Sequence, residues 1–195
     1  MRPCVFLDRD GTVNEEVGYL HEPEKISLIP GAAQAIKKLN ILGCLVVCIS
    51  NQAGVARGYY SIDAVHEVHQ KLEELLEEGG AHLDRIYFCP HHPTEGQYPY
   101  RINCECRKPG SGMLLKAAVE LNIDLKRSYL IGDRLSDIQA AKNAGLKAIL
   151  VLTGYGYKDL ENIINHQHIQ PDSICQDIGA AVDWILKQDK LIKSY

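Results

Sequence analysis

The chain has 195 residues, of which 46% are hydrophobic and 24% are charged, and its formal net charge is −4. These values are typical of one globular domain with a substantial core. The chain lacks the excess of basic residues that would indicate a nucleic-acid partner. We therefore expect a single domain over residues 1–195 that binds no nucleic acid.

Apolar runs alternate with helix-period segments along the chain, which predicts an α/β fold with a Rossmann-like parallel sheet flanked by helices. In chain order we expect a strand at 4–7, a helix at 30–40, a strand at 44–50, a helix at 61–78 and a strand at 85–89. An irregular loop follows at 90–103, and then a helix at 112–121, strand at 128–131, helix at 137–144, strand at 148–152, strand at 171–175 and helix at 178–187. Ligands of open α/β sheets bind outside the carboxyl ends of the strands, so the residues just after each strand form the candidate site.

The first predicted strand runs directly into the motif D-R-D-G-T, which contains Asp8 and Asp10. Alternate residues of an extended chain project to the same side, so these carboxylates can converge on one point. Their mutual repulsion is tolerable if Mg²⁺ lies between them, because this cation prefers carboxylate oxygen ligands. The alternative is a polar turn in which Asp and Gly only satisfy the turn geometry.

The second predicted strand ends on Ser50, Asn51 and Gln52, and Gly54 follows. A hydroxyl group and backbone N–H groups at a strand end can hold a phosphate oxygen, and a glycine allows close approach. The alternative is a capping turn, since Ser, Asn and Gly are frequent in turns generally. On the next helix, whose predicted N-cap is Ser61, we expect the histidines at 66 and 69 to face solvent.

Cysteine and histidine residues gather around the irregular loop, as C-P-H-H from residue 89 and C-E-C from residue 104. Four thiolate and imidazole ligands suit a tetrahedral structural zinc site, for which we expect Cys89, His91, Cys104 and Cys106. The spacing does not exclude His92 in place of His91, and the alternative to a metal site is a group of free cysteines with surface histidines. With an odd total of seven cysteines, the pattern favours a reducing environment over a disulfide framework.

Charged residues also follow the later strands. Arg107 and Lys108 precede a helix and can supply positive charge to a transferring phosphoryl group, although a solvated basic pair is the alternative. Asp133 comes directly after the strand at 128–131 and can complete the cation site, while Asp137 either orients that site or caps the following helix.

The chain resembles the haloacid dehalogenase (HAD) superfamily of phosphotransferases in four motifs and their order. These are D-x-D-G-T, a strand that ends on Ser, a later Lys and G-D-x-x-x-D. The motifs extend from Asp8 to Asp137 and cover most of the chain. The resemblance implies that Asp8 attacks phosphorus to form an aspartyl-phosphate, and that Asp10 protonates the leaving group and then deprotonates water. It also implies Mg²⁺ held by the carboxylates of Asp8 and Asp133 and by the backbone carbonyl of Asp10. The groups implied around the phosphoryl oxygens are Ser50, Asn51 and Lys108.

A narrower resemblance is carried by C-P-H-H-P and C-x-C-R-K-P, which are similar to motifs of the D-glycero-D-manno-heptose 1,7-bisphosphate 7-phosphatases and the related histidinol-phosphate phosphatases. This branch lacks a large mobile cap, and short segments shape its pocket, here 16–19, 52–57 and the zinc loop at 89–106. Arg107 would recognise the distal part of a bisphosphate, and Arg134 stands where the heptose enzymes carry Lys. The residues that the resemblance implies for substrate binding are Glu16, Val17, Gly18, Tyr19, Asn51, Gln52, Arg57, Arg107 and Arg134.

The resemblance thus implies a Mg²⁺-dependent phosphatase with a structural Zn²⁺ that removes the 7-phosphate of a heptose bisphosphate. It leaves open the α or β anomer, and with it a lipopolysaccharide core or GDP-heptose pathway. The alternatives are a histidinol-phosphate phosphatase and a non-catalytic, zinc-stabilised binding module, the latter opposed by the complete set of Asp8, Asp10, Lys108 and Asp133. The first residues lack the pattern of a signal peptide, and no run reaches membrane-spanning length. We therefore expect a cytoplasmic monomer that acts on a small sugar phosphate away from membranes.

Overall fold

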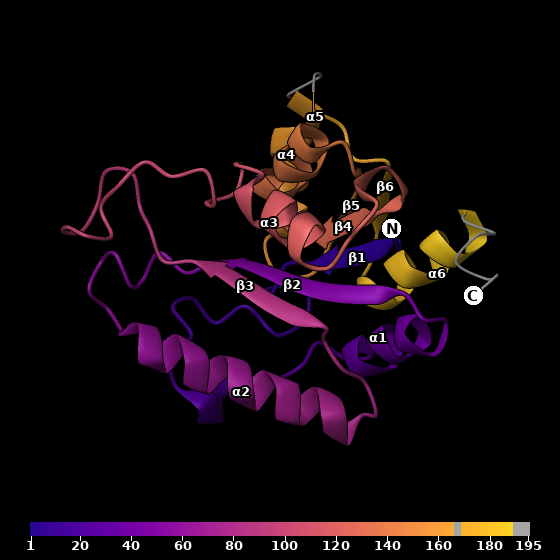
Figure 1. The fold of residues 1–195 in the computed structure, drawn as a ribbon, viewed down its shortest axis with the longest axis horizontal. Coiled ribbons are helices and arrows are strands. Elements are labelled where there is room, and N and C mark those ends of the chain that lie inside the picture. Colours follow the sequence, from indigo (N-terminus) through magenta and orange to yellow (C-terminus); the bar gives the residue numbers. More distant parts are fainter. Residues whose placement is uncertain (166–168, 189–195) are drawn as a thin grey trace.

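The computed structural model describes residues 1–165 and 169–188. Within these residues, one six-stranded parallel sheet has the order β3-β2-β1-β4-β5-β6 (Figure 1). The strands are β1 (Cys4–Leu7), β2 (Leu45–Asn51), β3 (Arg85–Cys89), β4 (Tyr129–Gly132), β5 (Lys147–Val151) and β6 (Ser173–Cys175). The helices are α1 (Ala32–Ile41), α2 (Ile62–Glu78), α3 (Gly112–Glu120), α4 (Leu135–Ala144), α5 (Gly156–Asn165) and α6 (Ile178–Gln188), with short 3₁₀ turns at Pro23–Lys25 and Leu125–Arg127.

Helices cover both faces of the sheet, with α1, α2 and α6 on one face and α3, α4 and α5 on the other (Figure 1). The alternation of side chains along β1 explains the two cores, because Val5 and Leu7 belong to the first and Cys4 and Phe6 to the second. A strand that is buried on both faces reads as a continuous apolar run, as the sequence of β1 does. The predicted α/β sheet with flanking helices is confirmed.

The parallel strands bring the candidate residues to one edge of the sheet. Leu7, the last residue of β1, pairs with Cys48 of β2 and Ile131 of β4, and β2 continues beyond this level to Asn51. The loop after β3 extends from the same edge, at the left in Figure 1. Within 1–165 and 169–188 no cap domain is inserted between the elements, in agreement with the expectation of short segments around the pocket.

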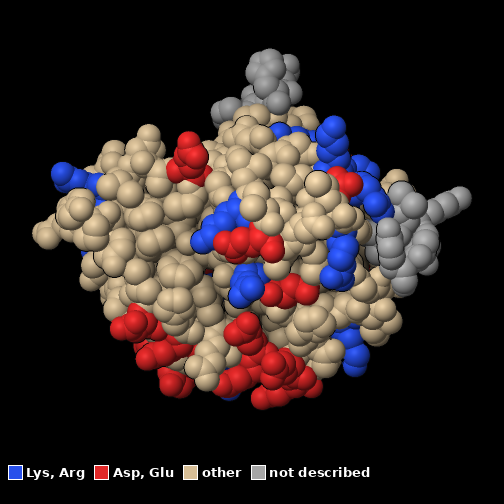
Figure 2. Space-filling view, viewed as in Figure 1, with Lys and Arg blue, Asp and Glu red and all other residues tan. Residues whose placement is uncertain are grey.

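Helix α2 begins after Ser61, whose Oγ accepts a hydrogen bond from the backbone N–H of Ala64 at 3.1 Å, as predicted for an N-cap. Its acidic side chains lie along the lower edge of the face shown in Figure 2. The expectation that His69 faces solvent is wrong, because only 6% of this residue is exposed, whereas His66 is exposed. His69 lies one helical turn before Leu72, on the apolar stripe of α2.

All predicted strands and helices are present, with ends that differ by up to two residues. Helix α5 was not predicted, because it begins at Gly156 and follows Gly154, and glycines are typical of loops. Tyr157 lies in the first turn of α5 and is 64% exposed. Among the described residues, no helix has the length and apolar character needed to span a membrane.

Candidate active site

A cavity of about 470 Å³ opens at the carboxyl edge of the sheet. With one exception, the residues predicted to bind phosphate, substrate or Mg²⁺ line it: Asp8, Asp10, Glu16, Gly18, Tyr19, Ser50, Asn51, Gln52, Arg57, Arg107, Lys108, Asp133 and Arg134. The exception is Val17, which is 54% exposed and does not line the cavity. Tyr60, Ser136 and Tyr155 line it as well.

Three buried carboxylates form a cluster at the cavity, and two of them, Asp8 and Asp133, line it. Single oxygens of Asp8, Asp133 and Asp137 all lie within 4.8 Å of one another. Burial, and then the negative charge of its neighbours, raises the pKa of Asp8 to about 7 and that of Asp133 to about 9. Asp133 Oδ2 accepts the N–H of Tyr155 at 2.7 Å, while Asp133 Oδ1 is buried without a hydrogen-bond partner among the described residues. This set of hard oxygen donors fits Mg²⁺, which would relieve the repulsion.

Lys108 lies between two of these acids. Its Nζ is 2.7 Å from Asp8 Oδ1 and 2.6 Å from Asp137 Oδ1, and it donates to the carbonyl of Ile49 at 3.1 Å. Burial favours the neutral amine, but the charges of Asp137 and Asp8 outweigh it and leave the pKa of Lys108 raised. The backbone of Lys108 exchanges two 3.0 Å hydrogen bonds with the side-chain amide of Asn51. Lys108 is therefore a charged, firmly positioned group and not a solvated one.

Asp137 has two roles in the structure. Besides its ion pair with Lys108, its Oδ2 accepts the backbone N–H of Arg134 at 3.0 Å, at the start of α4. The carboxylate therefore caps this helix and holds the lysine at the same time.

Asp10 has a different environment from that of Asp8. Its side chain is 17% exposed and forms a 2.9 Å ion pair with Arg9, whose side chain is fully buried. Burial alone would raise the pKa of Asp10, but Arg9 and hydrogen bonds from Asn14 and Gln52 outweigh it and leave the pKa lowered. The motif D-x-D gives no sign of a role for Arg9, because this residue occupies its variable position.

Gln52 connects Asp10 with the phosphate-binding candidate Ser50. Its Nε2 donates to Asp10 Oδ2 at 3.0 Å and to Ser50 Oγ at 2.7 Å, and its Oε1 accepts the hydroxyl of Tyr60 at 2.8 Å. A Cβ on Gly54 would lie 2.2 Å from the ring of Tyr60, so only a glycine at position 54 leaves room for this ring. Gln52 is 2% exposed, and its amide serves to organise the site from within.

Aromatic and charged groups form the rim on one side of the cavity. The guanidinium of Arg57 lies 5.4 Å from the ring centre of Tyr19 and pairs with Glu95 of the zinc loop at 2.9 Å. Arg107 donates to the carbonyl of His91 at 3.3 Å, which places it on the same loop. Segments 16–19, 52–57 and 89–106 therefore meet at this rim.

Arg134 also lines the cavity. Its guanidinium lies 4.2 Å from the ring centre of Tyr155, and its Nε is 3.2 Å from Asp159 Oδ2. Asp159 belongs to the unpredicted helix α5, so its contact with Arg134 was not visible in the sequence. Three arginines, Arg57, Arg107 and Arg134, thus line the cavity together with the acidic side chains.

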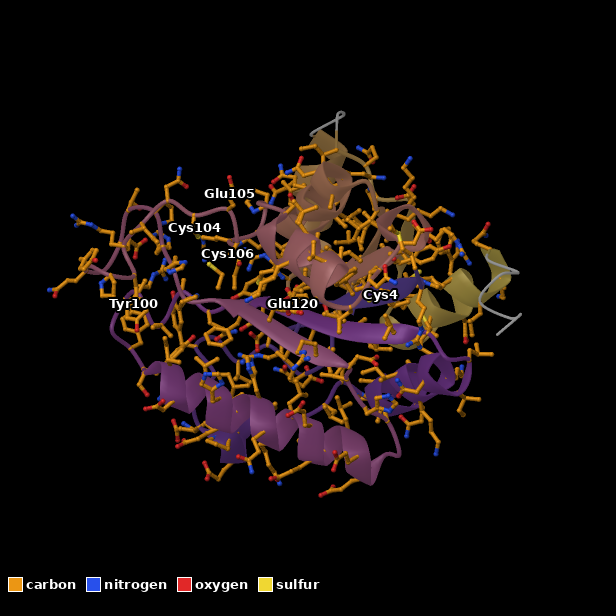
Figure 3. The ribbon with its side chains drawn as sticks, in the orientation of Figure 1. Cys4, Tyr100, Cys104, Glu105, Cys106 and Glu120 are labelled. Carbon is orange, nitrogen blue, oxygen red and sulfur yellow. The ribbon has the colours of Figure 1, made fainter. Side chains whose placement is uncertain are left out.

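The Cys and His residues at the two ends of the zinc loop also come together. Ligand atoms of Cys89, His91, Cys104 and Cys106 lie within 4.8 Å of one another, and the two cysteines of C-E-C are neighbours in Figure 3. His91 Nδ1 is 3.6 Å from Cys89 Sγ and 3.4 Å from Cys106 Sγ. His92 is turned away, since its Nδ1 accepts the N–H of Glu95 at 2.9 Å. Three sulfurs and one imidazole nitrogen in this arrangement fit tetrahedral zinc.

Comparisons with known proteins agree with this geometry. Residues 105–181 match a family model described as HAD-hyrolase-like. The D-glycero-D-manno-heptose-1,7-bisphosphate 7-phosphatase of Thermosynechococcus vestitus is 50% identical over 188 residues, which cover 94% of this chain and 95% of that protein. The D-glycero-beta-D-manno-heptose-1,7-bisphosphate 7-phosphatase of Pasteurella multocida is 45% identical over 155 residues, or 79% of this chain and 84% of that protein.

A solved structure is similar over nearly the whole chain. The crystal structure of D,D-heptose 1.7-bisphosphate phosphatase from B. bronchiseptica, complexed with magnesium and phosphate, has a TM-score of 0.83 and 34% identity, and the match covers 97% of this chain and 100% of that one. The identities, the coverage and the shared fold lead to one assignment. The chain belongs to the D-glycero-D-manno-heptose-1,7-bisphosphate 7-phosphatase family of the HAD superfamily and is a phosphoric monoester hydrolase.

Proposed function

We propose that this enzyme removes the 7-phosphate of D-glycero-D-manno-heptose 1,7-bisphosphate through an aspartyl-phosphate intermediate on Asp8, with bound Mg²⁺ and a structural Zn²⁺. The observation that carries the proposal is the cavity itself, which is lined by buried acids, Lys108 and arginines. The names of the relatives support the substrate, and the magnesium and phosphate of the B. bronchiseptica structure support the metal.

Asp8 is the nucleophile in this proposal. Its Oδ1 accepts the backbone N–H of Arg9 at 2.7 Å and also faces Lys108 Nζ at 2.7 Å, so we assign Oδ2 as the atom that attacks phosphorus. The carboxylates of Asp8 and Asp133 and the backbone carbonyl of Asp10 would hold Mg²⁺, which reduces the repulsion between the nucleophile and the phosphate dianion. Lys108 neutralises charge that spreads over the phosphoryl oxygens, as do hydrogen bonds from the neighbouring Ser50.

Asp10 is the general acid and base. It donates a proton to the oxygen on C7 as the P–O bond breaks, and it then removes a proton from the water that hydrolyses the aspartyl-phosphate. Its exposed edge faces the cavity, whereas its remaining contacts hold it against Arg9 and Gln52.

The rim binds the rest of the substrate. A heptose 1,7-bisphosphate carries a second phosphate at the far end of the sugar, and an arginine fork matches phosphate oxygens. We assign this end to Arg107 and Arg57 beside the zinc loop, and we assign further contacts with the substrate to Arg134 and the segment 16–19. Zn²⁺ held by the three cysteines and His91 at the ends of the loop would fix the segment that positions Arg107 and Lys108.

The proposal is tested by phosphate release in the presence of Mg²⁺. The substrates are both anomers of D-glycero-D-manno-heptose 1,7-bisphosphate, with histidinol phosphate and fructose 1,6-bisphosphate on the same preparation. We expect a heptose bisphosphate to lead by orders of magnitude in kcat/KM, and ³¹P NMR to show the 1-phosphate as product. A higher kcat/KM for histidinol phosphate would contradict the proposed substrate but not the proposed mechanism.

Asp8→Asn is the matching test of the mechanism, because an amide is a poor nucleophile. We expect it to lower kcat by roughly 1,000-fold or more. The control is Asp63→Asn, an exposed carboxylate in the first turn of α2, which should leave kcat unchanged. Full activity of Asp8→Asn would contradict the proposed mechanism.

A further inference from the structure

We propose that Arg9 is a positioning residue for the reaction, and that its guanidinium fork holds the Asp10 carboxylate where it exchanges protons with the substrate and with water. This inference rests on the proposed function, because it assigns to Arg9 a role through the acid and base of that reaction. Arg9 itself does not line the cavity.

The contact between the two side chains uses both edges of the carboxylate. Arg9 Nε donates to Asp10 Oδ1 at 3.1 Å, and Arg9 Nη2 donates to Oδ1 and Oδ2, each at 2.9 Å. A planar fork that holds both oxygens fixes the plane of the carboxylate as well as its position. A lysine ammonium keeps the charge but cannot impose that plane.

The tight turn after β1 brings these neighbouring side chains together. The carbonyl of Arg9 accepts the N–H groups of Val13 at 2.9 Å and Asn14 at 3.1 Å, and the N–H of Gly11 bonds back to the carbonyl of Asn14 at 2.8 Å. This arrangement closes the chain on itself between residues 9 and 14. Asn14 Nδ2 also donates to Asp10 Oδ1 at 3.0 Å.

Nothing else among the described residues pairs with the Arg9 charge. Its side chain is fully buried under the sheet edge, and Asp10 is its only ion-pair partner there. Arg9 Nη1 has no hydrogen-bond partner within that part of the chain. A fully buried guanidinium directed at a single, partly exposed carboxylate is costly as a purely structural element, which favours a role in the site.

The chemical consequence depends on the leaving group. When the P–O bond to an alkyl carbon breaks and the Asp8–phosphorus bond forms, the alkoxide needs the proton of Asp10. A nitrophenolate leaving group is stable as an anion and needs little proton transfer. A carboxylate that rotates away from its productive position therefore slows the alkyl substrate much more than the aryl one.

The test compares kcat/KM on heptose 1,7-bisphosphate and p-nitrophenyl phosphate for the full chain and for Arg9→Met and Arg9→Lys. We expect Arg9→Met to lose about 10-fold to 100-fold more on the heptose substrate than on the aryl substrate, and Arg9→Lys to show a smaller loss of the same kind. Arg85→Met, which removes an exposed arginine of β3, is the control and should behave as the unchanged chain.

Two results would overturn the inference. Equal losses on both substrates would mean that Arg9 only supports the fold, and the absence of any loss would mean that it has no role. If Arg9→Met does not fold, Arg9→Lys decides, because it retains the buried charge. Asp10→Asn in the same assay separates this inference from the proposed function. If Asp10→Asn loses more kcat/KM on the heptose substrate than on the aryl substrate and the Arg9 variants do not, only the inference about Arg9 is contradicted. If Asp10→Asn shows no such difference between the substrates, the acid and base role of Asp10 is contradicted.

Discussion

Gly11 lies where the backbone packs closely against the acid cluster. Its φ is +78°, in the left-handed region that glycine adopts without strain. A Cβ at this position would be 2.2 Å from Asp133 Oδ2 and 3.1 Å from the Cα of Gly154. Asp133, a proposed ligand of Mg²⁺, therefore packs directly on this glycine.

Gly11→Ala should displace Asp133 and weaken Mg²⁺ binding. We expect the Mg²⁺ concentration for half-maximal activity to rise by about 10-fold or more, in the range seen when support of a metal ligand is lost. Gly43→Ala is the matched control, because Gly43 has a φ of +69° but no atom within 4 Å of its Cβ position. An equal effect of both variants would show that backbone strain alone is responsible.

His69 is the residue whose burial has the clearest consequence for stability. Burial, and then the charges of Arg9 and His66, lowers its pKa from 6.5 to about 3, while Asp10 acts in the opposite direction. The unfolded chain therefore binds a proton at His69 more readily than the folded chain. The contribution of neutral His69 is present above pH 6.5 and is lost as the pH falls toward 3.

His69→Gln should reduce this acid sensitivity. In the unchanged chain, we expect His69 to lower the free energy of unfolding by up to about 1.4 kcal/mol for each pH unit below 6.5, and the variant to lack that part. Urea unfolding at pH 8, 6 and 5 measures the difference, with His66→Gln, an exposed histidine on the same helix, as the control. A parallel decline in all three proteins would contradict the prediction.

At the scale of elements, the zinc loop joins the metal cluster to the rim of the cavity. A Cβ on Gly96 would lie 1.7 Å from the carbonyl oxygen of Ala56, so the loop packs backbone to backbone on the segment after β2. Arg57 then connects that segment to Glu95 and Tyr19. Loosening the loop should therefore disturb substrate binding more than the chemistry at Asp8.

Cys104→Ser tests this connection by removing one proposed zinc ligand. We expect the zinc content to fall well below one per chain, KM for the bisphosphate to rise by about 10-fold or more and the loop to become sensitive to proteolysis. Elemental analysis, kinetics and limited trypsin digestion give the three readouts. Cys175→Ser changes a free thiol on β6 and should alter none of them. Unchanged zinc content in Cys104→Ser would contradict the assigned ligand set.

At the scale of the whole molecule, the sheet divides the hydrophobic interior into two cores. Leu72 of α2 belongs to one and Leu114 of α3 to the other, and both are almost fully buried. The strands contribute alternate side chains to each core, which couples the two sides mechanically. We therefore expect residues 1–195 to unfold as one cooperative unit.

Leu72→Ala and Leu114→Ala should each lower the free energy of unfolding by roughly 2–5 kcal/mol, because each leaves a cavity in a packed core. Val119→Ala, at a position that is 85% exposed, should change it little. Urea unfolding followed by circular dichroism and by Trp184 fluorescence should give one shared transition for every variant. Separate transitions would contradict the single domain, and light scattering on the same samples tests the expected monomer.

The sequence by itself predicted the sheet, most helices and most of the polar residues that line the cavity. Apolar runs and helix periods depend on neighbours in the chain, and parallel strands necessarily bring their carboxyl ends to one edge. Asp8 and Asp133 follow two such strands and Ser50 lies near the end of a third, so their convergence followed from the strand assignment. The Cys and His motifs likewise contained the residues that form the compact cluster.

The tertiary structure alone decided which polar groups are buried and what they face. Arg9 occupies a variable motif position, and only the turn after β1 directs its fork at Asp10. His91 and His92 are adjacent in sequence, but the fold of the loop turns just one of them toward the sulfurs. Helix α5 brings Asp159 to Arg134, although the glycines near its start indicated a loop. Burial and side-chain direction arise from contacts between distant segments, and local patterns in a sequence do not contain them.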